Sequence, residues 1–317
     1  MTLAVGIDLG GTTARVALVD ASGAIVRDAR EVLTAYSPQA VVAHLHGLVR
    51  SLGNDAPSLP AAMGIAAQLW VRTGVVAVAP NLGWKDVPVG QLMGEAFGHP
   101  VRLVNDLDAI TTGEARCGAG RGEQDVLCIF IGTGVGMGAM CQGLLLEGAD
   151  GLATELAHCK VASPTKGRAC GCGERGCLEA YTSGRHLPEL LAEKAATGLA
   201  SPLLQSVGSD LKQINAVRIE AAAEDGDSAA SALWDDVAQK LGVAFANTVT
   251  LLNPRVLVLG GGVLTSAPSL RQRIVEVLRE NAARPALSRL EIRDTVLGDK
   301  AGLVGAGLLA QASLSSP

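Results

Sequence analysis

Three cysteines lie close together in the segment ACGCGERGCLEA, at Cys170, Cys172 and Cys177. The spacing C-x-C-x4-C, with glycines between the thiols, lets the backbone wrap a small ion, and zinc binds thiolate sulfur and imidazole nitrogen tetrahedrally. A closed zinc site needs a fourth ligand, for which His158 is the first candidate and Cys159 the second. The alternative is a flexible loop of reduced thiols, which would be prone to oxidation. The segment predicts a structural metal site.

Three glycine-rich turns form a second group of candidate residues, at 10–12, 132–138 and 260–262. Glycine lets a backbone approach a ligand closely, and successive N–H groups in such a turn point at an anion such as phosphate. One such turn alone is more simply a tight hairpin, but three in one chain favour a nucleotide. The residues after the second turn predict a strand rather than the helix of a dinucleotide-binding fold, and the sequence contains no Walker-type G-K-[ST] motif.

A carboxylate follows the apolar stretch VRLVN, in the pair Asn105-Asp106. An Asn-Asp pair at the end of a strand is commonly a helix cap. Phosphoryl transfer to a hydroxyl, in contrast, needs an anion cradle, Mg²⁺ and a base that orients and deprotonates the attacking oxygen. The residues alone leave both interpretations open.

Size and composition limit the class of protein. The 317 residues exceed the usual size of one core and predict two domains, and 48% of them are hydrophobic. A balance of 31 acidic to 26 basic residues, without a long run of like charge, argues against nucleic acid as the main ligand. No signal peptide is evident, so we expect a cytoplasmic protein. Seven cysteines in a reducing compartment favour metal binding over disulfides.

Hydrophobic patterning predicts the elements that position these residues. The apolar run 126–146 is interrupted by five glycines, so it predicts two buried strands around a turn rather than a membrane helix. Its strand, glycine turn and second strand match the start of the chain in character, which indicates two halves built on one plan. The predicted strands are 3–9, 14–20, 24–33, 63–67 and 101–105, and the predicted helices include 37–52, 88–98, 228–252 and 301–312.

The order of these motifs resembles the actin-like ATPase and sugar-kinase superfamily. GIDLGGT resembles its first phosphate motif, FIGTGVG its second and LGGGV its adenosine motif, while ITTGEARCGAG and AGLVGAGLL resemble its connecting helices. The resemblance implies an α/β protein of the two-domain, ribonuclease H-like fold, with a duplicated βββαβαβα core and an active-site cleft between the domains. We place an N-terminal domain at 1–112, completed by a helix at 300–317, and a larger domain with the zinc loop at 113–299. The nucleotide-binding residues implied are Asp8, which would engage magnesium through water, and Gly10, Gly11, Thr12, Gly132, Thr133, Gly134, Gly260, Gly261 and Gly262.

Two further segments, ELAH and CGCGERGCLE, resemble the E-x-G-H and C-x-C-G-x2-G-C-x-E motifs of the ROK family of bacterial sugar kinases and regulators. The resemblance implies that His158 and the three cysteines hold a structural zinc ion. The ion would fix a loop so that Glu155, His158 and Glu179 converge on a sugar.

The same family resemblance extends to the catalytic and sugar-binding groups. NDLDAI resembles the family's N-D-x-N-x-A motif, which implies that Asp106 is the general base and that both Asn105 and Asp106 contact the sugar. PNLGW resembles P-N-x-x-W, which implies that Asn81 contacts the sugar while Trp84 packs nearby.

The function implied is ATP-dependent transfer of the γ-phosphate to the 6-hydroxyl of a hexose, with Mg²⁺ and with glucose as the first candidate. The motifs place no Arg or Lys in the sugar pocket, which favours a neutral sugar. N-acetylmannosamine, fructose, mannose or allose as substrate, and polyphosphate as donor, remain alternatives. A sugar-responsive regulator is less favoured, because a strand that starts by residue 3 leaves no room for a DNA-binding domain. We expect a homo-oligomer, a dimer or tetramer, with neither nucleic acid nor membrane as partner.

Three positions depart from the family pattern. Gln68-Leu69 stands where relatives have Pro-Gly, in a loop that borders the sugar, so Gln68 or Trp70 would alter which epimer or substituent is accepted. Ala157 replaces the glycine of E-x-G-H, and Asp108 replaces the second asparagine of N-D-x-N.

Overall fold

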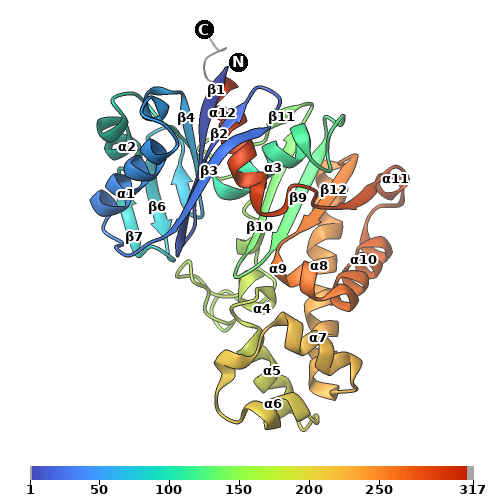
Figure 1. Ribbon diagram of the computed structural model, residues 1–317. Helices are drawn as coiled ribbons and strands as arrows, with labels where there is room; N and C mark the ends of the chain where they lie inside the picture. The colour runs from blue at the N-terminus through green and yellow to red at the C-terminus, as the bar shows by residue number, and fades with distance from the viewer. Residues whose placement is uncertain (1, 313–317) are drawn as a thin grey trace.

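The structure, a computed structural model, describes residues 2–312. Two five-stranded sheets dominate it, with the orders β3-β2-β1-β4-β8 and β11-β10-β9-β12-β13. In each sheet the first three strands of the half are antiparallel neighbours, and the two later strands are parallel to the first. The two sheets stand side by side in Figure 1, with a group of helices below the second. This repetition confirms the predicted duplicated α/β plan.

The N-terminal half matches the predicted elements closely, except between residues 66 and 88. Its elements are β1 (Leu3–Leu9), β2 (Thr13–Asp20), β3 (Ile25–Val32), α1 (Pro38–Ser51), η1 (Ala56–Ser58), β4 (Ala61–Ile65), β5 (Gln68–Trp70), β6 (Val75–Ala79), β7 (Trp84–Val87), α2 (Val89–Phe97), β8 (Arg102–Asn105) and α3 (Asp106–Cys117). Ser37 caps α1 as expected, and Gly98 ends α2 in the left-handed conformation with φ 73°.

The C-terminal half repeats the plan but carries extra helices between its third and fourth strands. Its elements are β9 (Val126–Ile131), β10 (Val135–Cys141), β11 (Leu144–Leu145), η2 (Leu156–His158), α4 (Glu179–Thr182), α5 (Leu187–Ala196), α6 (Pro202–Val207), η3 (Leu211–Gln213), α7 (Ala216–Glu224), α8 (Ser228–Leu252), β12 (Val256–Gly260), α9 (Gly262–Ser266), α10 (Pro268–Asn281), α11 (Arg284–Leu287), β13 (Glu291–Asp294), η4 (Gly298–Lys300) and α12 (Ala301–Ala312). The helix α8 has the predicted bounds, because Asp227 caps its start and Asn253 ends it with φ 47°.

A third sheet, β5-β6-β7, was not among the predicted elements. Its strands are three to five residues long and alternate with turns at Gly74 and Gly83, so no periodic pattern is long enough to mark them. The sheet buries Leu69, Val76 and Trp84 in the core of the N-terminal half. It forms one wall of the functional site described below.

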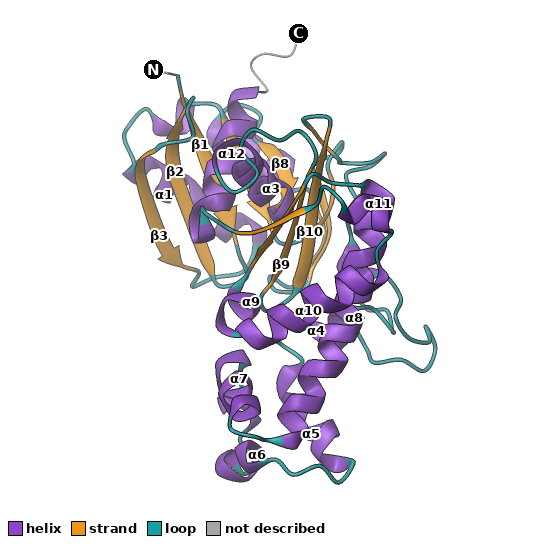
Figure 2. Ribbon diagram, turned by 90° about the vertical axis from the view of Figure 1, so that its right-hand side faces the viewer, coloured by secondary structure: helices purple, strands orange, loops and turns teal. Residues whose placement is uncertain are grey.

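The last helix, α12, returns to the N-terminal half and lies beside α3 and β1 (Figure 2). Small residues make this contact possible: a Cβ on Gly305 would lie 1.7 Å from the Ala109 carbonyl oxygen, and one on Gly6 would lie 2.1 Å from that of Leu303. The predicted helix at 300–317 is therefore present as α12, and residues 313–317 of that prediction lie outside the described residues. Within residues 2–312, no helix combines the length and apolar character that a membrane span requires.

Candidate functional site

A cavity of about 440 Å³ lies where the two main sheets face each other. Its walls come from the carboxyl ends of β1, β8, β9 and β12, the place where open parallel sheets bind ligands. The predicted residues that line it are Gly10, Gly11, Asn81, Asn105, Asp106, Gly132, Thr133, Gly134, Glu155, His158, Cys172, Glu179 and Gly261. The structure therefore brings together side chains and turns that are as far as 251 residues apart in the sequence.

Asp106 is the first residue of α3 and lies in the floor of the cavity. Asn105 caps the helix, because its Oδ1 accepts from the Leu107 N–H at 2.8 Å, while its Nδ2 donates to the Ala67 carbonyl at 3.1 Å. Burial, and then the charge of Asp8, raises the pKa of Asp106 to about 7. The helix-cap interpretation and the base interpretation are therefore compatible: Asn105 caps the helix, and Asp106 is held as a group that exchanges protons near neutral pH.

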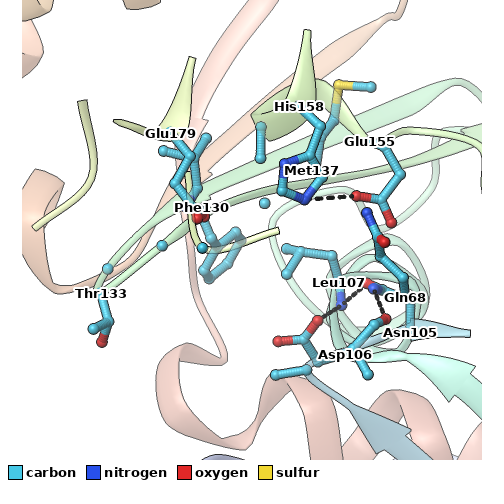
Figure 3. Close-up of a pocket in the computed structure, with 18 of the residues that line it drawn as sticks. Gln68, Asn105, Asp106, Leu107, Phe130, Thr133, Met137, Glu155, His158 and Glu179 are labelled. Atoms are coloured by element: carbon cyan, nitrogen blue, oxygen red, sulfur yellow. Dashed lines mark hydrogen bonds and ion pairs between the residues drawn. The ribbon is translucent and has the colours of Figure 1, made fainter. Parts of the chain in front are cut away.

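Glu155, His158 and Glu179 form the opposite wall, as Figure 3 shows. His158 Nε2 lies 3.6 Å from Glu155 Oε2, since η2 turns both side chains to one side. Burial, and then the charge of Asp106, raises the pKa of Glu155 to about 7. Glu179 Oε2 accepts from the Val135 N–H at 3.1 Å, which ties this wall to the second glycine turn.

Four potential metal ligands, His158, Cys170, Cys172 and Cys177, have donor atoms that all lie within 4.8 Å of one another. His158 Nδ1 faces the Cys170 sulfur at 3.8 Å, and the sulfurs of Cys172 and Cys177 are 3.9 Å apart. Cys159 is exposed and is not part of the group. One imidazole and three thiols match the closed tetrahedral set that zinc prefers, so the residues fit the predicted ion.

This cluster is joined to the cavity through His158. Its Nδ1 points into the cluster, whereas its Nε2 points to Glu155 in the cavity wall. Burial raises the pKa of the Cys170 thiol to about 12, so this thiol is not a thiolate by itself. A cation would have to displace its proton.

Some of the predicted nucleotide-binding residues of the three glycine turns line the cavity, and others do not. Gly10, Gly11, Gly132, Thr133, Gly134 and Gly261 line it, whereas Asp8, Thr12, Gly260 and Gly262 do not. Gly260 instead packs under the ring of Phe130, where a Cβ would lie 2.5 Å from the ring, and Phe130 reaches the cavity in its place.

Asp8 lies behind the first turn. Burial raises its pKa, the Arg15 charge opposes that effect, and a Cβ on Gly302 would be 3.5 Å from the Asp8 carboxyl carbon. Its carboxyl group is therefore packed against the start of α12, and it acts on Asp106 through its charge.

The segment PNLGW lies between β6 and β7 and brings Asn81 to the cavity, as predicted. Trp84 packs in the core next to this segment: its side chain is 5% exposed, donates its indole N–H to the Tyr36 carbonyl at 2.7 Å and does not line the cavity. The sheet β5-β6-β7 turns Trp84 into the core. Trp84 therefore affects the site only indirectly, by holding β7 in place.

One arginine lines the cavity, although the sequence motifs place no Arg or Lys there. Arg185, six residues beyond Glu179, lines the cavity and donates through Nη2 to Asn81 Oδ1 at 2.5 Å. None of the sequence motifs extends to this position. Its contact with Asn81 joins segments that are 104 residues apart, so spacing along the chain gives no signal for it.

The three departures from the family pattern have different environments. Gln68 lines the cavity and lies between Glu155 and Asn105 in the view of Figure 3, whereas Trp70 is 40% exposed and does not line it. Ala157 is buried, and Asp108 is 4% exposed, with no hydrogen-bond partner for its Oδ1 within residues 2–312. Gln68 and Ala157 line the cavity, whereas Trp70 and Asp108 do not.

The duplicated sheets, the glycine turns at their facing ends and the buried carboxylate between them define the actin-like class of phosphotransferase folds. Comparison with known families narrows this class, because the model of the ROK family matches residues 4–313. The chain belongs to the ROK family. The sequence-based family assignment and fold class are thereby confirmed.

Several characterised relatives cover nearly the whole chain. The glucokinases of Halalkalibacterium halodurans and Thermotoga maritima are each 31% identical, over 97% and 95% of this chain and 94% and 95% of their own. The crystal structure of a ROK family glucokinase from Streptomyces griseus, in complex with glucose and AMPPNP, is 30% identical. It superposes with a TM-score of 0.80 over 98% of this chain and 99% of that one.

Proposed function

We propose that this protein is an ATP-dependent glucokinase, which transfers the γ-phosphoryl group of ATP to the 6-hydroxyl of glucose. The observation that carries the proposal is the position of Asp106, on the floor of one cavity that has acid and imidazole groups on one wall and glycine turns on another. Glucose is favoured over other hexoses because the relatives with about 31% identity over nearly the full chain are named glucokinases.

In the proposed reaction, Asp106 accepts the proton of the sugar hydroxyl as that oxygen forms a bond to the γ-phosphorus. The bond from this phosphorus to the bridging oxygen breaks, and ADP leaves with the electron pair. A pKa of about 7 for Asp106 suits the role, since a base works best when its pKa lies near the working pH. Asn105 would hold the sugar, and its bonds to Leu107 and Ala67 fix its orientation.

Neutral hydroxyls fit the sugar side of the cavity. Glu155 and Glu179 offer acceptors, whereas Asn81 and Gln68 offer both donors and acceptors. A phosphorylated or acidic sugar would add negative charge beside three carboxylates, including Asp106. A hexose without charge is therefore the better substrate.

We further propose that His158, Cys170, Cys172 and Cys177 hold a structural zinc ion. The donor set fits zinc, and a bound ion would fix the imidazole of His158 so that Nε2 stays directed at Glu155. Magnesium, when bound with ATP, would neutralise phosphate charge. We propose that Asp8 contacts this magnesium ion through water. We also propose that Thr12, Gly260 and Gly262 belong to the nucleotide site, although they do not line the cavity.

Three other features remain proposals. We place the domain boundaries at 1–112 with 300–317, and at 113–299, because α12 packs on the N-terminal sheet. A homodimer or tetramer and a cytoplasmic location are likewise predictions.

The activity is tested by incubating the protein with a hexose panel and either ATP or polyphosphate, and detecting hexose phosphates by mass spectrometry. We expect glucose 6-phosphate with ATP, together with one ADP per sugar phosphate. If N-acetylmannosamine, mannose, fructose or allose is phosphorylated in preference to glucose, that sugar is the substrate and the assignment of glucose is wrong. The absence of any hexose phosphate would refute the proposed function.

A further inference from the structure

The segment Gly184-Arg185 runs along the second glycine turn. The Gly184 N–H donates to the Gly132 carbonyl at 2.9 Å, and the Arg185 N–H donates to the Thr133 carbonyl at 3.2 Å. These two bonds fix the backbone of Arg185 beside a turn whose own amides line the cavity.

The side chain of Arg185 extends from this turn to the N-terminal half. Nη2 donates to Asn81 Oδ1 at 2.5 Å. Asn81 in turn packs on the first glycine turn, since a Cβ on Gly11 would lie 2.5 Å from the Asn81 Cβ. Nη1 lies 3.5 Å from the position of a Cβ on Gly171, in the cysteine loop. The guanidinium therefore lies between the two glycine turns, at the edge of the metal-binding loop.

The charge at this position is unusual for the cavity. Arg185 is the one lysine or arginine among the described residues that line it, and the charged groups otherwise include Asp106, Glu155 and Glu179. Within residues 2–312 the guanidinium forms no ion pair, although three carboxylates line the same cavity. Among the described residues its side chain donates to a neutral amide, that of Asn81, so other N–H donors of the planar fork are available to a ligand.

We propose that Arg185 is a catalytic residue that binds the phosphoryl group in transfer and stabilises the negative charge that develops on its oxygens. The proposal rests on the proposed kinase function. During transfer, charge spreads over the equatorial oxygens of the γ-phosphoryl group and onto the bridging oxygen that leaves with ADP. A guanidinium fork held between two phosphate-binding turns can donate two parallel hydrogen bonds to such oxygens. The bond to Asn81 holds the fork in place until the phosphate arrives.

A different role for Arg185 would be to orient Asn81 toward the sugar. The two roles differ in the ligand that they affect: a phosphate-binding arginine acts on the nucleotide, whereas a residue that positions Asn81 acts on the hexose. Binding measurements with separate ligands therefore distinguish them.

The test uses Arg185→Ala and Arg185→Lys in the full chain, with Arg72→Ala as a matched control, because Arg72 is an exposed arginine that does not line the cavity. Calorimetry measures the binding of magnesium AMPPNP, adenosine and glucose, and steady-state kinetics give kcat/KM for ATP. We expect Arg185→Ala to lower kcat/KM for ATP about 100-fold and to weaken AMPPNP about tenfold. Adenosine and glucose should bind as in the wild type, and Arg185→Lys should recover part of the loss because it keeps the charge without the fork.

Two outcomes would overturn the inference. One is AMPPNP binding and kcat/KM for ATP in Arg185→Ala that stay within about twofold of the wild type. The other is a loss of glucose affinity with AMPPNP unchanged, which would assign Arg185 to the support of Asn81. Failure of the proposed function is separate, since it would appear as a wild-type protein that forms no hexose phosphate, whatever AMPPNP binding shows.

Discussion

Asp108 offers a direct test of the electrostatics of the cleft. It lies in the first turn of α3, is 4% exposed, and its Oδ1 has no hydrogen-bond partner among the described residues. Burial, and then the charge of Glu147, raises its pKa to about 8, with Asp106 and Glu155 adding to the effect. Arg102 opposes the shift, but its guanidinium is 3.1 Å from Glu147 and is shared with that carboxylate. The carboxyl group of Asp108 is therefore protonated at neutral pH.

The expected change in stability follows from this pKa. A carboxyl group with a raised pKa stabilises the fold below its unfolded pKa, near 3.8, and that contribution is lost as the pH rises through about 8. The difference between these two pKa values corresponds to about 6 kcal/mol. Relaxation and water penetration absorb part of it, so we expect Asp108→Asn to become about 2 kcal/mol more stable relative to wild type between pH 5 and pH 9.

Urea unfolding at pH 5, 6, 7, 8 and 9, followed by tryptophan fluorescence, measures this difference. Trp84, buried in the N-terminal half, and Trp234, buried in the C-terminal half, report on both parts of the molecule. Asp28→Asn is the matched control, because Asp28 is an exposed aspartate on β3 and the substitution makes the same change from carboxyl to amide. A difference between Asp108→Asn and wild type that stays constant across this pH range would show that the carboxyl group is solvated, and the reasoning would fail.

Three further predictions concern the site. Asp106→Ala should fold and bind glucose but lose about 10²- to 10⁴-fold in turnover. Wild-type kcat/KM should rise with pH and level off above about 7, because the base must be unprotonated. A wild-type rate in the variant would remove Asp106 from the mechanism. Cys172→Ser should lose about one zinc per chain by elemental analysis and should bind glucose more weakly, whereas tight glucose binding without metal would refute the structural role of zinc. Gln68→Ala should raise KM for glucose more than it lowers kcat, and one deoxyglucose should show no further loss in the variant; equal losses for every deoxyglucose would exclude a direct contact.

The fold was predictable to the extent that its elements carry long or well-capped patterns. The helix α8 has the predicted ends because Asp227 and Asn253 are capping residues whose side chain or backbone suits those positions. The strands around the glycine turns were likewise found from their apolar composition. The sheet β5-β6-β7 was missed, since its short strands are defined by their pairing with each other rather than by a local pattern.

The site was predictable where each residue belongs to a motif that the family shares. Asp106, Glu155, Glu179 and the four candidate metal ligands were all named from such motifs, and the structure places all of them in or beside the cavity. The motif around Trp84 gives the order of its residues but not the direction of the Trp84 side chain on β7. The backbone pairing of β6 with β7 decides that direction.

Arg185 was not predicted from the sequence, and the distribution of charge in the cavity explains its position. The sugar side of the cavity collects carboxylates, and burial is the first cause of the raised pKa values of Asp106 and Glu155. Such a wall suits hydroxyl groups, but it repels the phosphates that must approach Asp106 from the other side. A positive group is therefore needed on the nucleotide side, near the turns and away from the carboxylates. Arg185 meets this requirement because its backbone is bonded to the second turn and its side chain to Asn81. The first contact lies within the C-terminal half, and the second joins the two halves.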